Sequence, residues 1–238
     1  MGLIPYQYLT FAGRSSEDFD CHISGSGTYN SPQRDIENIA VPGRNGDLHI
    51  DNGRFNNIEI TYPAFITKHF EHNYAHLKTF LLSKRGYQRL EDTYHPDFYR
   101  RARFVGNITP VMSTLNKAGS FDLTFDCDPR RFFLSGEIVI TLNADGNITN
   151  LSQFPALPLI RAYGTGSMTV NGITVQIQTA DGYTDIDSEL QEAYKGSTNC
   201  NNNIILTNGA FPELAPGTNV ITFTGLTKLE IKPNWWTV

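Results

Sequence analysis

The sequence predicts a mainly β protein with one main helix, divided into an α+β N-terminal domain and an all-β C-terminal domain. Short segments of alternating apolar and polar residues, separated by Gly, Asn and Pro, recur along the chain and are typical of strands joined by turns. Only 18% of the residues are charged, whereas coiled coils and long helical bundles are rich in Ala, Glu, Lys and Leu. Composition also changes near Glu137. Residues 1–137 contain 15 Lys or Arg, 16 Asp or Glu and all six His, whereas residues 138–238 contain 4, 8 and none.

We expect the N-terminal domain, residues 1–137, to be a β-sandwich. Ile58, Ile60 and Tyr62 alternate with polar residues, which is the pattern of a half-buried strand. Phe121 and Cys127 bound another such run, and this position predicts that Cys127 is a core residue. The predicted strands cover residues 3–11, 19–23, 57–65, 87–90, 99–104 and 121–127.

A polar hairpin arm is predicted at about residues 35–51. Its strands, 35–41 and 48–51, flank a tip in which Asn45–Gly46 is the strongest turn signal, because both residues tolerate a positive φ. A two-stranded ribbon is not stable alone, and its free edges can pair with another chain. We therefore expect the arm to pack on a neighbouring subunit through Asp35, Glu37, Ile39, Val41, Arg44, Asn45, Asp47 and His49.

One helix is predicted at about residues 73–85, because large apolar residues recur there three or four positions apart. Lys84 and Arg85 then fall in its last turn, where cations favour the helix dipole, and Gly86 occupies the position of a C-cap glycine. The residues expected to anchor the helix to the sheet are Tyr74, Leu77, Phe80 and Leu81.

The C-terminal domain, residues 138–238, is predicted to be a β-sandwich or jelly roll. Strand signals of about five residues alternate with turn signals through the whole domain. The clearest is a hairpin in which Asn171–Gly172 joins residues 168–170 to residues 173–175.

Composition excludes several classes of function. The formal net charge is −5 and the pI is about 5.6, the opposite of the balance that nucleic-acid binders and polybasic membrane binders need. No run of 18 apolar residues is present, and the N-terminus lacks the basic and apolar regions of a signal peptide. Cys21, Cys127 and Cys200 are far apart and predict neither a zinc site nor a disulfide framework.

Two clusters are candidates for chemistry, and each also has a structural explanation. His69, His72 and His76 would share a helix face and could hold a metal, but the sequence lacks His-Glu-x-x-His and a solvated face is favoured. The second cluster predicts either a calcium or glycosidase site or, more strongly, a solvated strand face with Asp185, Asp187 and Glu189 in solvent. Its members are Asp181, Asp185, Asp187, Glu189 and Glu192.

Basic and aromatic clusters favour structural roles. The arginines Arg100, Arg101, Arg103, Arg130 and Arg131 are expected to form a salt-bridged surface or a subunit contact rather than a phosphate site, because acids nearly balance them in the same half. Trp235 and Trp236 could stack on a sugar. Adjacent strand residues face opposite ways, however, so we expect only one of them to close the core. No nucleophile elbow, dinucleotide loop or P-loop is present.

The order and spacing of many short segments resemble the distal tail protein (Dit) family of long-tailed phages with non-contractile tails. In the N-terminal half these segments are residues 42–46, 74–84, 86–92, 119–121 and 125–132. In the C-terminal half they are 185–189, 193–194, 201–203, 211–214, 216–219 and 231–235. The C-terminal signature includes Asp185, Asp187, Tyr194, Pro212 and Trp235. One departure is Asn234, where the family pattern leads us to expect arginine.

The resemblance implies a non-enzymatic hub protein of the virion, made in the host cytoplasm and located at the tail tip. It implies a homo-hexameric ring, formed by the N-terminal domain and its arm, with a galectin-like C-terminal sandwich projecting outward. The implied partners are the tail tube protein, a tail-associated hub or lysin-type protein and a receptor-binding protein. DNA would pass through the channel without specific binding, and neither a cofactor nor a membrane is implied.

Two other functions stay open. A host-surface carbohydrate-binding module would fit a galectin-like sandwich, although only by analogy of fold. A cell-wall hydrolase would need the acidic cluster around Asp185. A hexamer that forms without ligand would favour the hub.

Overall fold

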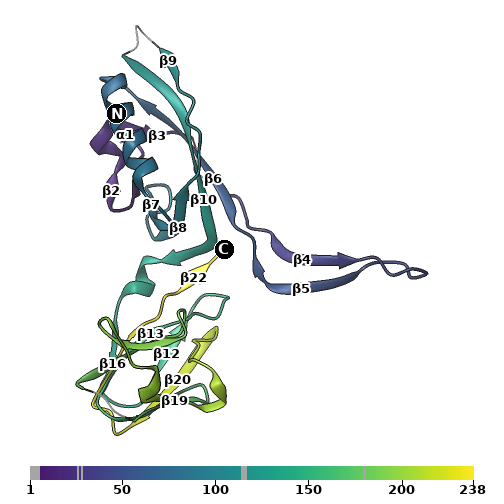
Figure 1. Ribbon diagram of the computed structural model, residues 1–238, viewed down its shortest axis with the longest axis vertical. Coiled ribbons are helices and arrows are strands. Elements are labelled where there is room, and N and C mark those ends of the chain that lie inside the picture. Colours follow the sequence, from purple (N-terminus) through teal and green to yellow (C-terminus); the bar gives the residue numbers. More distant parts are fainter. Residues whose placement is uncertain (1–5, 26, 28, 114–116, 179–180) are drawn as a thin grey trace. The chain divides into compact units, whose positions relative to one another are not determined.

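The computed structural model describes residues 6–25, 27, 29–113, 117–178 and 181–238. The chain divides into two compact units, Met1–Arg131 with Val238, and Phe132–Thr237. The division falls between Arg131 and Phe132, before the composition change at Glu137. Each unit has its own hydrophobic core, so each is described by itself (Figure 1).

The first unit is built on an antiparallel sheet with the strand order β2-β1-β7-β8-β10-β6-β3, and β9 also pairs with β10. Alternation in β6 and β10 brings Ile60 opposite Phe125 on the buried face. The strands are β1 (Leu9–Phe11), β2 (Arg14–Ser15), β3 (Cys21–Ile23), β6 (Ile58–Ile66), β7 (Gln88–Asp92), β8 (Phe98–Phe104), β9 (Val111–Ser113) and β10 (Ala118–Phe133).

Near the N-terminus, two predicted strands are shorter than expected. The strand predicted at residues 3–11 begins only at Leu9, and residues 3–5 lie outside the described part of the chain. Phe19 belongs to a 3-10 helix, η1 (Ser16–Phe19), because the Ser15 hydroxyl caps its first turn and Asp20 ends it in the left-handed conformation. Cys127 is fully buried, as predicted.

The helix α1 (Phe70–Ser83) covers the core of the first unit with the predicted residues. Leu77 and Leu81 are buried, whereas Tyr74 and Phe80 are half-buried against the same core. The predicted bounds are wrong by two or three residues at each end. Phe70 already packs in the core, where Gly119 leaves room for its ring.

The end of α1 also differs from the prediction. Lys84 is extended, so Lys84 and Arg85 follow the last turn instead of occupying it. Gly86 has φ +67° but lies too far along the chain to cap the helix. The sequence does not reveal where the helix starts, because no side chain caps it. His69 precedes the first turn in the left-handed conformation and makes no side-chain hydrogen bond to it.

Leu77→Ala is expected to reduce the free energy of unfolding by about 2–5 kcal/mol, because it removes a fully buried side chain and leaves a cavity. Denaturant unfolding followed by far-ultraviolet circular dichroism measures the loss. Leu82 is on the same helix but 62% exposed, so Leu82→Ala is the matched control with an expected change within about 0.5 kcal/mol. Equal losses in the two variants would contradict the placement of this face.

The second unit consists of two antiparallel sheets that share one core. The six-stranded sheet has the order β11-β21-β13-β16-β17-β18, and the five-stranded sheet β12-β20-β14-β15-β19. The first contains β11 (Ile140–Leu142), β13 (Leu159–Tyr163), β16 (Tyr183–Asp187), β17 (Glu192–Lys195), β18 (Thr198–Asn199) and β21 (Lys228–Lys232). The second contains β12 (Gly146–Asn150), β14 (Gly166–Val170), β15 (Ile173–Ile177), β19 (Ile204–Leu206) and β20 (Gly217–Thr224).

The hairpin predicted at Asn171–Gly172 is confirmed, and it joins β14 to β15. Asn171 and Gly172 both have a positive φ (+48° and +88°), as a type I′ turn requires. The last strand, β22 (Trp236–Thr237), pairs with β10, whose last two residues belong to the second unit. The fold is thus mainly β with one α-helix among the described residues, as predicted. No helix in the described ranges is long and apolar enough to cross a membrane.

Candidate functional site

The predicted arm is a separate two-stranded sheet of β4 (Arg34–Ile39) and β5 (Leu48–Phe55). In Figure 1 it extends away from the large sheet of the first unit. Nearly all of its residues are exposed, and Asp35 is half-buried. The eight predicted arm residues lie on these strands or on the loop between them, in one exposed ribbon. Their role at a subunit interface stays a prediction.

Ion pairs hold the base of the arm together. The Arg54 guanidinium lies 2.6 Å from the Asp35 carboxylate, and Arg34 lies 3.2 Å from Asp51. Hydrogen bonds from Arg54 and Asn52 hold the pKa of the Asp35 carboxyl below its ordinary value. The polar groups at the base are therefore satisfied within the arm itself.

Toward the tip, one face of the arm carries three apolar side chains beside Glu37. The register places Ile39 opposite Leu48 and Glu37 opposite Ile50, so Ile39, Leu48 and Ile50 share a face. These side chains are 38%, 44% and 40% exposed. The other face carries Asn38 and His49, which hydrogen-bond to each other. We call Ile39, Leu48 and Ile50 the apolar stripe. Polar residues separate the members of the stripe in the sequence, and alternation within each strand is the signal that reveals it.

The predicted tip, residues 42–47, lies between the two strands, but its hydrogen-bonded turn is not at Asn45–Gly46, the strongest turn signal. The chain reverses at Pro42–Gly43, where the Arg44 amide donates to the Val41 carbonyl across 3.2 Å and Gly43 has φ +78°. Pro followed by Gly at the two central positions is the sequence of a type II turn. Asn45 keeps an ordinary φ and lies in an exposed bend, because the loop is too long for a two-residue turn.

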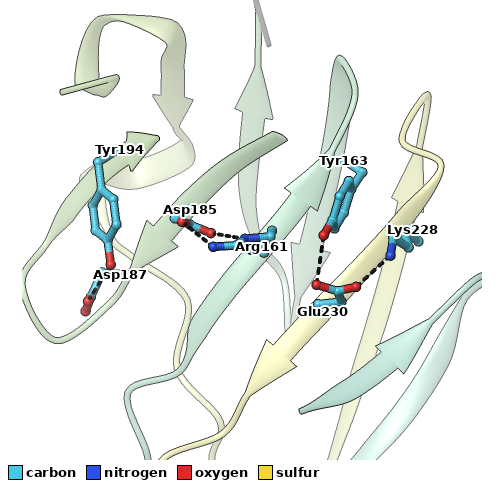
Figure 2. A network of polar contacts seen from close by, with 7 residues as sticks. All are labelled: Arg161, Tyr163, Asp185, Asp187, Tyr194, Lys228 and Glu230. Atoms are coloured by element: carbon cyan, nitrogen blue, oxygen red, sulfur yellow. Dashed lines mark hydrogen bonds and ion pairs between the residues drawn. The ribbon is translucent and has the colours of Figure 1, made fainter. Parts of the chain in front are cut away.

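The acidic cluster of the second unit is not a row of solvated carboxylates. Asp185 is only 3% exposed, and its two oxygens accept hydrogen bonds from Arg161 at 2.7 and 2.9 Å (Figure 2). Strand β16 lies between β13 and β17, so Arg161 and Tyr194 flank Asp185 across the sheet. The expectation that Asp185 faces solvent is therefore wrong. Its partner Arg161 is 24 residues away in the chain, where no local pattern could indicate it.

The same face carries a second set of contacts, also drawn in Figure 2. Glu230 accepts hydrogen bonds from Tyr163 at 2.9 Å and from Lys228 at 2.6 Å, and both lower the pKa of its carboxyl. The Tyr194 hydroxyl lies 3.5 Å from Asp187. These acids are occupied by partners within the sheet. Among the described residues no group of three His, Cys, Asp or Glu side chains could hold a metal ion.

The histidine cluster is only partly helical. His69 precedes α1, whereas His72 and His76 lie on it with their rings 4.2 Å apart. All three are exposed. This placement agrees with the solvated face that the sequence favoured.

The tryptophan pair corrects another expectation, because both rings are half-buried against the second core. Trp236 stacks on Phe154 with ring centroids 4.3 Å apart and donates a hydrogen bond to the Pro155 carbonyl. The two side chains do not point to opposite faces as they would in a regular strand, because Asn234, just before the pair, has φ +57°. Asparagine tolerates this conformation better than arginine does, which explains the departure at Asn234. Pro212, another signature residue, is buried.

Several arginines of the two basic clusters have partners among the described contacts. Arg103 lies 2.6 Å from Asp126, and Arg130 binds Asp128 through two hydrogen bonds of 2.9 and 2.7 Å. Arg131 covers the ring of Phe98 at 4.2 Å. In addition, Arg100 is half-buried, and desolvation lowers the pKa of its guanidinium. The described contacts thus include acid partners for Arg103 and Arg130, as predicted.

The Arg130–Asp128 pair makes stability depend on pH. Burial raises the pKa of the Asp128 carboxyl, but the hydrogen bonds and charge of Arg130 outweigh it and hold that pKa below its ordinary value. Such a group stabilises the fold above its unfolded-state pKa and loses this contribution as pH falls through the folded-state pKa. We expect Arg130→Met to cost about 1–2 kcal/mol at pH 7 and less below about pH 4.

Urea unfolding of both proteins across the acid range measures this difference. Arg103→Met is the control, because the Arg103 side chain is 55% exposed and water screens its pair with Asp126. Its cost should be smaller at every pH. A difference for Arg130→Met that grows as the pH falls would contradict the stated direction.

Neither a protein-family model nor a curated protein matches this sequence. Solved structures match its fold. Dit (gp 19.1) of phage SPP1, described as a paradigm of the hub adsorption apparatus in phages that infect Gram-positive bacteria, aligns with a TM-score of 0.76. That alignment covers 98% of this chain and 100% of the other at 13% identity. A chain of the phage p2 baseplate, in its activated conformation with Sr, aligns with a TM-score of 0.53, covering 95% and 97% of the two chains at 12% identity.

Proposed function

We propose that this chain, whose fold is that of SPP1 Dit, is a structural hub protein of a phage tail tip. The observation that carries the proposal is the extent of the match, because one known hub protein aligns over 98% of this chain and all of its own. A match confined to one sandwich would support only a common domain, since such domains serve many functions. A chain of a second phage baseplate has the same fold.

In this role the chain forms a homo-hexameric ring at the tail tip of the virion. The first unit makes the ring, and the arm contacts the neighbouring subunit. The ring joins the tail tube protein to a tail-associated hub or lysin-type protein and to a receptor-binding protein. The chain is a structural component without enzymatic activity. Its internally paired acids support this view, because Asp185 and Glu230 are occupied by Arg161, Lys228 and Tyr163.

Native mass spectrometry of the purified full chain tests the proposal. We expect six copies per particle without any ligand, and a ring with a central opening in electron micrographs. A protein that stays monomeric over a wide range of concentrations would contradict the hub.

DNA passes through the central channel without being held. A basic wall would bind phosphates and slow their passage at low salt, whereas a neutral or acidic wall would not. The pairing of Arg103 with Asp126 and of Arg130 with Asp128 supports this, as does the net charge of −5 per chain. We expect the assembled ring to show no tight, salt-dependent binding of duplex DNA in a filter or fluorescence assay. Tight binding that charge reversal at Arg103 abolishes would overturn it.

Sugar binding is the second candidate function, and one hollow on the second unit favours it. The hollow has a volume of about 540 Å³ and is lined by Tyr183, Lys195, Thr198 and Asn203, among others. An aromatic ring beside hydroxyl and amide groups suits a saccharide. Binding of host cell-wall polysaccharide that Tyr183→Ala removes would support this function.

A further inference from the structure

The arm contains a chemically reactive peptide at its tip. The chain has four Asn–Gly pairs, beginning at Asn45, Asn52, Asn171 and Asn208. We propose that Asn45 is a site of spontaneous deamidation, and that docking of the arm in the assembled ring slows the reaction. The first statement concerns the chain alone, whereas the second rests on the proposed function.

The reaction needs only the chain and water. The backbone nitrogen of Gly46 attacks the side-chain carbonyl carbon Cγ of Asn45, and a five-membered succinimide forms as ammonia leaves. Water then opens the ring at either carbonyl and gives aspartate or isoaspartate. In sum, one amide and one water become one carboxylic acid and one ammonia, with no oxidation or reduction. Gly46 favours the attack because it has no side chain to obstruct the approach.

At Asn45 nothing in the described structure restrains the two reacting groups. Asn45 and Gly46 are exposed and lie in a bend of the loop between β4 and β5. No hydrogen bond of the Asn45 side chain or of the Gly46 amide occurs among the described contacts. The nitrogen and the side-chain carbonyl are therefore free to reach the geometry of attack.

Two other Asn–Gly pairs are restrained and serve as internal controls. The Asn171 side chain donates to Asn219 at 2.6 Å and accepts from the Val220 amide at 3.1 Å, which holds it away from Gly172. At Asn52 the attacking group, the Gly53 backbone nitrogen, is occupied, because its N–H donates a hydrogen bond to Asp51 at 2.8 Å. Each must break hydrogen bonds before it reacts.

Deamidation would change the arm in two ways. It adds a negative charge three residues from the apolar stripe residue Leu48, in a chain that is already acidic. The isoaspartate product also lengthens the backbone by one carbon at residue 45, because the chain then reaches the Gly46 nitrogen through Cβ and Cγ. Both changes disfavour docking of the arm, so a chain that stays unassembled gradually loses its capacity to join a ring.

Incubation of the full chain in mildly alkaline buffer, followed by peptide mass spectrometry, tests the site. We expect Asn45 to convert roughly ten times faster than Asn171 or Asn52, because the restrained pairs react only from a locally opened minority. Fragment ions must assign the site, since Asn45 and Asn52 lie on one tryptic peptide between Arg44 and Arg54. Asn45→Ala should remove the fast phase. Conversion of Asn171 or Asn52 at the rate of Asn45 would overturn the proposal.

The coupling to assembly is tested on the wild-type ring and on an unassembled variant with Ile39→Lys and Ile50→Lys. We expect Asn45 to convert several-fold more slowly in the ring. Equal rates in a ring and in the variant would overturn the coupling while the hub proposal stands. A wild-type chain that forms no ring contradicts the hub instead, and the comparison of Asn45 with Asn171 still decides the reactive site.

Discussion

Gly166→Ala is expected to reduce the stability of the second unit by about 3–5 kcal/mol, among the largest effects of any single substitution. A Cβ at this position would lie 2.1 Å from the Thr224 carbonyl oxygen and 2.9 Å from backbone atoms of Gly225. Every one of these contacts is with backbone, so no side-chain rotation can relieve them. Strands β14 and β20, which are paired at Ser167 and Thr224, would have to separate.

Tryptophan fluorescence during urea unfolding measures this effect, because both tryptophans of the chain belong to the second unit. Gly182→Ala is the matched control. Gly182 has φ +81° but open space around it, so the expected cost is only the 1–2 kcal/mol, roughly, of a left-handed alanine. A Gly166→Ala protein that unfolds at the wild-type urea concentration would show that the two strands do not approach this closely.

If the chain forms the proposed ring, lysine in the apolar stripe of the arm is expected to abolish it. The double variant Ile39→Lys, Ile50→Lys places two charges among the exposed apolar side chains of the stripe. Buried apolar anchors at the centre of an interface contribute about 2–4 kcal/mol each, and a ring repeats the loss at every contact. The variant should be a folded monomer by native mass spectrometry and circular dichroism.

The control introduces the same two lysines on the opposite face, as Asn38→Lys, His49→Lys. It should still assemble, because the two substituted positions, Asn38 and His49, are already polar. Removing residues 37–49 should likewise leave a folded monomer. A complete ring from the deleted protein would exclude the arm from the subunit contact. If only the control variant Asn38→Lys, His49→Lys loses the ring, the subunit contact lies on the face opposite the apolar stripe.

Alternation and turn residues predict much of this fold. The run from Phe121 to Cys127 and the Asn171–Gly172 hairpin both lie where the sequence places them. Both depend on interactions between residues close in the chain, which a local pattern can reveal. Helix α1 was predicted with its correct apolar face, but its start depends on Phe70 fitting against Gly119. That contact spans about fifty residues and leaves no local signal.

The candidate site is predicted less completely, for the same reason. The arm was predicted from its turn residues, although Pro42–Gly43 makes the turn and Asn45–Gly46 does not. Asp185 was expected in solvent because its neighbours alternate in polarity. Whether a polar residue on an outer face is exposed depends on what the adjacent strands place beside it, and here Arg161 comes from a different strand.

The two ends of the second unit meet, which gives the chain a modular design. The Phe133 amide donates to the Trp235 carbonyl at 2.9 Å, and the Asn234 amide donates to the Gly136 carbonyl at 2.9 Å. Gly136 is required at this junction, since a Cβ there would lie 2.4 Å from the Trp235 nitrogen. Because hydrogen bonds hold its first and last segments side by side, the sandwich is a module with adjacent ends. It can be exchanged for another domain with adjacent ends, or grafted onto a different carrier protein, without redesign of the first unit.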